Sequence, residues 1–69
     1  MAVATVVEIL KAGGQIGFEL DSHTVVWGDA RKVRNAISRC GLRVGDVIDY
    51  QLEDSGELAG FRLANEQEA

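Results

Sequence analysis

Apolar and polar residues alternate strictly along residues 15–20, where Ile16, Phe18 and Leu20 fall on one face. Successive side chains of a strand point to opposite faces, so this period of two predicts a β-strand with one face toward a core. Four other short runs are rich in β-branched or alternating apolar residues and are bounded by turn residues. The pattern therefore predicts five strands, over residues 3–10, 15–20, 24–27, 47–52 and 58–64.

The period changes to that of a helix after Asp29. One stripe is apolar and consists of Ala30, Val33, Ala36, Ile37 and Cys40. Residues at this spacing share one face of a helix, and the polar residues between them face the other way. Asp29 is a suitable N-cap and Gly41 a suitable C-terminal stop, so a short amphipathic helix is expected between them.

The same parity rule assigns faces within the strands. It places Trp27 with Val25 and opposite Val26, unless a β-bulge shifts the pattern. In the last strand it places Ala59, Phe61 and Leu63 on one side, and we assign Phe61 and Tyr50 to the core. The glycine pair at 13–14 supplies the positive φ of a tight hairpin turn.

Five short strands with one helix between the third and the fourth follow the plan of the OB-fold. We therefore predict a mainly β fold: a five-stranded OB-fold Greek-key barrel with a short amphipathic helix between strands 3 and 4. An SH3-like barrel, which usually lacks such a helix, is the alternative. One domain is expected over residues 1–64, followed by a frayed acidic tail over residues 65–69.

Composition narrows the class of protein. An apolar share of 46% in 69 residues is enough for a folded core, but a chain this short leaves little room for an elaborate catalytic cleft. The single Cys40 forms no internal disulfide, which favours a reducing compartment, and we expect the cytoplasm. The apolar opening is interrupted by Glu8 and is too short to span a bilayer, so no membrane association is expected.

Charge is strongly segregated along the chain. The formal net charge is -4, yet five of the seven Lys and Arg residues lie between Asp29 and Asp46 with no acid among them: Arg31, Lys32, Arg34, Arg39 and Arg43. Guanidinium groups suit phosphate oxygens, so these side chains are candidate phosphate contacts; the alternative is an ordinary solvated helix face. Arg31 and Lys32 favour binding, because cations are disfavoured at a helix N-terminus.

Two aromatic residues are candidate base contacts. Trp27 could stack on a base from the third strand, or it could cover the end of a barrel beneath the helix. Phe18 could stack likewise, although its alternation with Ile16 and Leu20 favours the core.

The remaining reactive residue types form no catalytic pattern. His23 lies in a polar turn without the second His or the Cys that a zinc site needs, and Cys40 lies on the apolar helical stripe. The glycine pair lacks the residues of a nucleotide-binding loop, and the carboxylates around residues 53–57 are typical of a solvated turn. We therefore expect a binding protein that is not an enzyme and has no metal and no cofactor.

In its order of segments the chain resembles bacterial translation initiation factor one, a family of one-domain OB-fold proteins. The similarity spans roughly residues 4–63 and rests on five segments: ATVVE at 4–8, IGFEL at 16–20, HTVV at 23–26, RKVRN at 31–35 and VGDV at 44–47. The resemblance implies a cytoplasmic protein that contacts ribosomal RNA through its basic loop and helix. Cold-shock proteins are similar in length and in the glycine-rich second strand, but they display more aromatic residues on their RNA-binding strands.

Together these observations predict a protein that binds RNA or another single-stranded nucleic acid, with the small ribosomal subunit as a candidate partner. The alternatives are a cold-shock-like binder of single strands and a protein-interaction OB module. In the latter, a protein partner meets either the basic helix or the acidic remainder.

Overall fold

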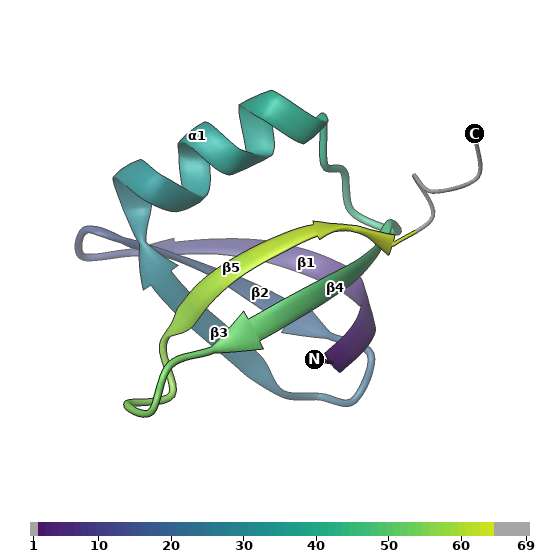
Figure 1. Cartoon of the computed structure of the whole chain (residues 1–69), viewed down its shortest axis with the longest axis horizontal. Helices are drawn as coiled ribbons and strands as arrows, with labels where there is room; N and C mark the ends of the chain where they lie inside the picture. Colours follow the sequence, from purple (N-terminus) through teal and green to yellow (C-terminus); the bar gives the residue numbers. More distant parts are fainter. Residues whose placement is uncertain (1, 65–69) are drawn as a thin grey trace.

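The computed structural model describes residues 2–64 and consists of five strands and one helix (Figure 1). The elements are β1 (Ala2–Ala12), β2 (Gln15–Leu20), β3 (Val25–Asp29), α1 (Ala30–Cys40), β4 (Val47–Leu52) and β5 (Leu58–Leu63). These bounds agree with the predicted elements to within two residues, and the predicted tail, residues 65–69, lies outside the described residues.

The strands form one antiparallel sheet in the order β3-β2-β1-β4-β5. β1 is central because its two halves have different partners: residues 2–5 pair with β4, and residues 6–12 pair with β2. The register shifts between Val6 and Glu8, where Val7 forms a bulge. A bulge bends its strand and increases the local twist, so the sheet curves around its inner face.

The predicted mainly β fold with its helix between β3 and β4 is confirmed, but the sheet is not closed into a barrel. Within residues 2–64, β3 and β5 approach each other without forming a hydrogen-bonded ladder. Around Gly28 the two strands meet by packing, since a Cβ at that glycine would lie 3.2 Å from the Cβ of Leu58.

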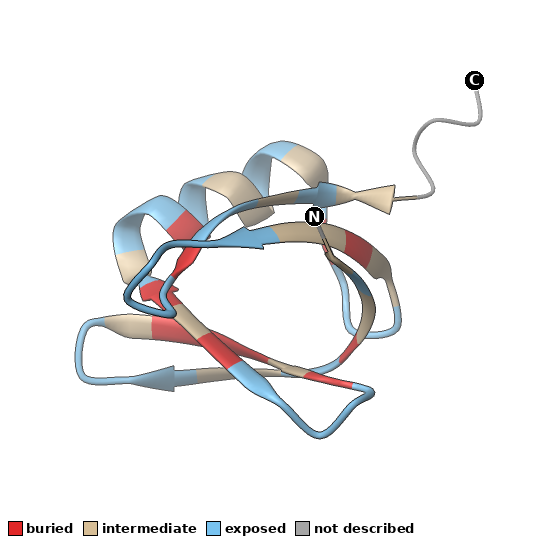
Figure 2. Ribbon diagram, turned by 60° about the horizontal axis from the view of Figure 1, so that its bottom comes forward, coloured by how far each residue is buried: buried red, intermediate tan, exposed pale blue. Residues whose placement is uncertain are grey.

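The core fills the concave face of the curved sheet (Figure 2). Its buried residues are Val6, Ile16, Phe18, Leu20, Val26, Val33, Leu42, Ile48 and Leu58. The ring of Phe18 packs edge-to-face on that of Phe61, with centroids 5.0 Å apart. Tyr50 and Phe61 are half-buried and pack against this core, as predicted.

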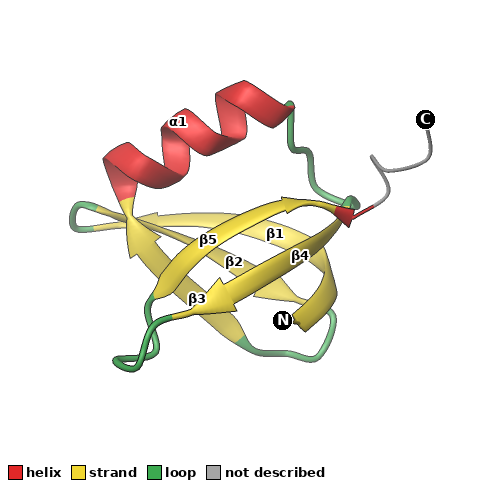
Figure 3. Ribbon diagram, in the orientation of Figure 1, coloured by secondary structure: helices red, strands yellow, loops and turns green. Residues whose placement is uncertain are grey.

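The helix α1 lies across one side of the sheet and is capped at both ends (Figure 3). The Lys32 N–H donates to Asp29 Oδ2 at 3.1 Å, and Gly41, with φ of 71°, donates its N–H to the Ile37 carbonyl at 2.8 Å. Both predicted caps are confirmed. Val33 is buried beneath the helix, where Gly28 allows close approach: a Cβ there would lie 2.9 Å from Val33 Cγ2.

The face prediction for β5 is wrong at its first residues. The register pairs Gln51 with Gly60 but Leu52 with Leu58, so Ala59 is an extra residue in a bulge. Leu58 consequently turns inward and is buried, whereas Ala59 is exposed. Sequence parity cannot reveal a bulge, because the bulge is a property of the pairing between strands.

Within residues 2–64, no helix combines the length and the apolar character that crossing a membrane requires.

Candidate nucleic-acid interface

One face of α1 carries all of its charged side chains, and all of these are cations. Arg31, Lys32, Arg34 and Arg39 are exposed, while the apolar stripe on the other side packs toward the core. Because the helix rises by about 1.5 Å per residue, the charge from Arg31 to Arg39 extends over roughly 12 Å along the helix. We call these four side chains, together with Arg43 in the following loop, the cationic face.

The cationic face has no internal counter-charge. Among residues 2–64 the only Lys or Arg nitrogen within 4.0 Å of a carboxylate oxygen is that of Arg62, which pairs with Asp49 at 3.6 Å. The first turn of α1 contains no acid, so Arg31 and Lys32 lie at the positive end of the helix dipole, where the N-cap Asp29 supplies one carboxylate. Five neighbouring cations therefore remain available to an anion.

Arg43 extends the cationic face beyond the C-terminal end of α1 on a well-fixed backbone. Its N–H donates to Asp46 Oδ2 at 2.9 Å, and its carbonyl accepts from the Asp46 N–H at 3.0 Å. The same turn is bonded to β1, since the Gly45 N–H donates to the Val6 carbonyl at 2.7 Å. The loop position of Arg43 is therefore defined by the fold, and its side chain is exposed.

Trp27 lies on the outer face of the sheet, opposite the core. It pairs with Gly17, whose neighbours Ile16 and Phe18 both point inward. A Cβ at Gly17 would lie 2.7 Å from Trp27 Cε3, so the indole lies directly over the glycine. Parity placed Trp27 with Val25 and opposite the buried Val26, and this is confirmed; the indole does not cover the inner end beneath the helix.

The surroundings of Trp27 are asymmetric. Two residues along β2 from Gly17, the partner of Trp27, lies Glu19 on the same outer face. Glu19 pairs with Glu8 of β1, so two carboxylates lie on this side of Trp27. On the other side lie Gln15 and Asp29, which begin the approach to α1. The Ala30 N–H donates to the Gly14 carbonyl at 3.0 Å and thereby fixes the start of the helix beside the β1–β2 hairpin.

An open hollow lies between the β1–β2 hairpin and the first turn of α1. It is lined by Gly14, Asp29, Ala30, Arg31, Lys32 and Arg34. A chain that crosses Trp27 toward the helix would enter this hollow and meet the first cations of α1. The hollow thus brings together Arg31, Lys32 and Arg34. Trp27 does not line it, and Arg39 and Arg43 lie in the last turn of α1 and in the loop that follows.

Phe18 does not belong to this surface. It is fully buried and its ring contacts Phe61, so it has no face on which a base could stack. The core interpretation of this residue is correct, and its candidacy as a nucleic-acid contact is wrong. The reason is its parity with Ile16 and Leu20, which are also buried.

The other residues considered for chemistry are isolated. His23 is exposed in the β2–β3 turn and has a positive φ of 69°, while Cys40 is half-buried with its Sγ 4.0 Å from the Ile37 carbonyl oxygen. In the part of the chain that the structure describes, no three His, Cys, Asp or Glu residues come together as metal ligands.

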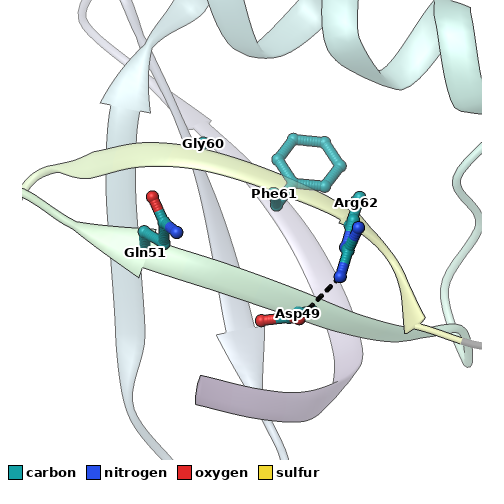
Figure 4. Close-up of a pocket in the computed structure, with 5 residues that line it drawn as sticks. All are labelled: Asp49, Gln51, Gly60, Phe61 and Arg62. Carbon is teal, nitrogen blue, oxygen red and sulfur yellow. Dashed lines mark ion pairs between the residues drawn. The ribbon is translucent and has the colours of Figure 1, made fainter. Parts of the chain in front are cut away.

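Two hollows lined by β5 were not foreseen from the sequence. The first contains Asp49, Gln51, Gly60, Phe61 and Arg62 (Figure 4). There Arg62 points toward Asp49, so this cation already has a protein partner, although Asp49 Oδ1 is enclosed and accepts no hydrogen bond from the described residues. Only the cross-strand register places Asp49 opposite Arg62, and no local signal gives it.

The second hollow is a groove between α1 and the β4–β5 hairpin. It is lined by Asp29, Lys32, Val33, Ala36, Glu53, Glu57, Leu58, Ala59, Gly60 and Phe61. Its lining combines an apolar floor with carboxylates from a turn that the sequence suggested to be merely solvated.

Comparisons with models of protein families, with curated proteins and with solved structures give no match to this chain.

Proposed function

We propose that this protein binds RNA by holding the phosphate backbone on the cationic face and stacking a base on Trp27. The observation that carries this proposal is the set of exposed cations on α1 that have no carboxylate partner within residues 2–64. Phosphates would supply the missing counter-charge, and arginine forks hold phosphate oxygens by two parallel hydrogen bonds.

The surroundings of Trp27 set the direction of the bound strand. A base on the indole has two carboxylates on one side, at Glu8 and Glu19, while on the other side a single carboxylate, Asp29, lines the hollow together with Arg31 and Arg34. Like charge repels phosphates from the first side, so the backbone runs from Trp27 over the β1–β2 hairpin to α1. Stacking and phosphate contacts tolerate any base, so sequence preference is expected to be weak.

We also propose that the architecture is that of an OB-fold. In its support, the helix lies between β3 and β4, β1 pairs with both β2 and β4, and β3 approaches β5. The outer face of strands two and three is where OB-folds often bind oligonucleotides, and Trp27 lies on that face. Given the resemblance to translation initiation factor one, RNA of the small ribosomal subunit is the first ligand to test, and the cytoplasm is the proposed setting.

The test is the anisotropy of labelled single-stranded RNA titrated with protein at about 50 mM and about 200 mM salt. The variant R31Q/R34Q removes two cations, so the slope of log K against log salt should become shallower by about 1.4, at roughly 0.7 per contact. The variant Trp27→Leu should lose about 1–3 kcal/mol of binding free energy with little change in that slope.

A matched control separates local contact from net charge. T24E/Q51E changes the formal net charge from -4 to -6, as R31Q/R34Q does, but at exposed sites outside the cationic face. Its RNA affinity should fall much less than that of R31Q/R34Q. Equal losses in both double variants, or no binding by the unchanged protein, would reject the proposal. Labelled single-stranded DNA of the same sequence distinguishes an RNA-binding protein from a general single-strand binder, which would bind the RNA and the DNA with equal affinity.

A further inference from the structure

We propose a second binding surface: the groove between α1 and the β4–β5 hairpin takes an arginine-bearing segment of a protein partner. We define the acidic groove by its floor and rim. Its floor is Val33, Ala36, Leu58, Ala59 and Phe61, and its rim carries Asp29, Lys32, Glu53 and Glu57. This inference does not depend on RNA binding, since only Lys32 of the cationic face belongs to the groove and the ligand has the opposite charge.

The floor of the acidic groove is apolar and hollow for identifiable reasons. Val33 and Leu58 are almost fully buried and form its base, while Ala36 and Ala59 are too small to fill the space above them. The β5 bulge turns Leu58 inward and leaves only the methyl of Ala59 at the surface. The resulting volume is about 180 Å³, which suits one long side chain.

The rim gives the acidic groove a net negative charge. Three carboxylates and one ammonium sum to -2, and Lys32 has no nitrogen within 4.0 Å of Glu53 or Glu57. The two glutamates are held side by side, because the Glu53 N–H donates to the Glu57 carbonyl at 2.8 Å. The hairpin between them is closed by a Gly56 N–H bond to the Glu53 carbonyl, also 2.8 Å.

This combination selects the chemistry of the occupant. Phosphates are repelled by the rim, and a bare metal ion gains nothing from the apolar floor. An arginine side chain fits both parts, since its methylene stem can lie on Ala36 and Phe61 while its guanidinium reaches the carboxylates. Arginine is favoured over lysine because its planar fork can bind carboxylate oxygens by two hydrogen bonds at once.

The acidic groove and the cationic face share the helix but use opposite sides of its N-terminal half. Asp29 and Lys32 line both hollows, whereas Arg31 and Arg34 line only the hollow beside Gly14 of the β1–β2 hairpin. The protein could therefore bind a basic protein partner in the groove and RNA on the cationic face at the same time.

The test is an NMR titration of ¹⁵N-labelled protein with the peptide acetyl-Ala-Leu-Arg-Leu-Ala-amide, up to about 10 mM to allow for weak binding. Saturable shifts are expected at the amides of Val33, Ala36 and Ala59. The same peptide with citrulline in place of arginine keeps the shape without the charge and should bind at least about tenfold more weakly.

Two protein variants and a control complete the test. E53Q/E57Q should lower the affinity for the arginine peptide by about tenfold, and Ala36→Leu should prevent its binding by filling the groove. E8Q/E19Q makes the same charge change, from -4 to -2, at a pair of carboxylates on the outer face of the sheet, and should leave binding unchanged. The proposal is overturned if saturable shifts are lacking, if citrulline binds equally well, or if E8Q/E19Q weakens binding as much as E53Q/E57Q does.

RNA provides the independent arm. E53Q/E57Q should retain full RNA affinity, and R31Q/R34Q should retain full peptide affinity. If the unmodified protein binds no RNA, the RNA proposal is rejected and the peptide result is unaffected. If it binds no arginine peptide, the groove proposal is rejected and the RNA result is unaffected.

Discussion

Gly17 and Trp27 show how one residue without a side chain can make a binding surface. They are directly opposite on β2 and β3, and the indole occupies the space that a Cβ of Gly17 would need. The glycine therefore lets the indole pack close against the outer face of the sheet, where Trp27 is half-buried. A flat, fixed aromatic surface loses little conformational entropy when a base stacks on it.

At this scale we expect Gly17→Ala to destabilise the protein. The added methyl would lie within 3.0 Å of three indole carbons, so Trp27 must move, at a cost of about 1–3 kcal/mol in the free energy of unfolding. Gly60→Ala is the control, since a Cβ there meets nothing within 4 Å and its φ is not positive. Urea unfolding followed by tryptophan emission measures both. Equal stability and unchanged native emission in the two variants would contradict the proposed packing.

The helix α1 is the element on which both binding proposals depend. It is short, so the packing of its apolar stripe on the core stabilises it, and its two caps add to that stability. Asp29 also serves a second purpose, because its position at the end of β3 starts the helix beside the hairpin glycine. The cap thus sets both the length of α1 and the place where its first cations lie.

Asp29→Ala should lower the free energy of unfolding by about 1 kcal/mol, since the Lys32 N–H loses its acceptor. Asp29→Asn keeps a capping oxygen, so it should lower the free energy of unfolding much less, although it removes the same charge. Urea denaturation monitored by far-ultraviolet circular dichroism compares the two. If Asp29→Asn lowers the free energy of unfolding as much as Asp29→Ala does, the carboxylate acts through its charge and not as a cap.

In the whole molecule, opposite charges occupy separate surfaces around one small core. The helix carries cations on its solvent face, while the β4–β5 hairpin and the outer face of β1 and β2 carry carboxylates. Such separation creates local fields much stronger than the net charge suggests, and these fields steer charged partners to different sides. The formal charge of -4 therefore does not exclude an anionic ligand.

The strand order predicts a gradient of protection in amide hydrogen exchange. β2 has a hydrogen-bonded strand on both sides along residues 15–19, whereas β3 and β5 each have one partner, so amides of β2 should exchange most slowly and the outer edges of β3 and β5 fastest. NMR-detected exchange at neutral pH measures this, with the capped helix as an internal reference. Equally slow exchange at both edges would mean that β3 and β5 pair in solution and close a barrel.

The sequence alone determined the strands, the helix and its two caps, because these depend on periods and capping residues that are neighbours along the chain. It also determined the inward faces of β2 and α1, and it placed Phe18 in the core more firmly than on the surface. The tertiary structure alone decided the features that depend on register. These are the position of Trp27 over Gly17, the bulge that turns Leu58 inward, the pairing of Asp49 with Arg62, and the groove between α1 and the β4–β5 hairpin. Register joins residues of different strands and is set by turn geometry together with the burial of one face of the sheet, so the pattern within a single strand does not specify it.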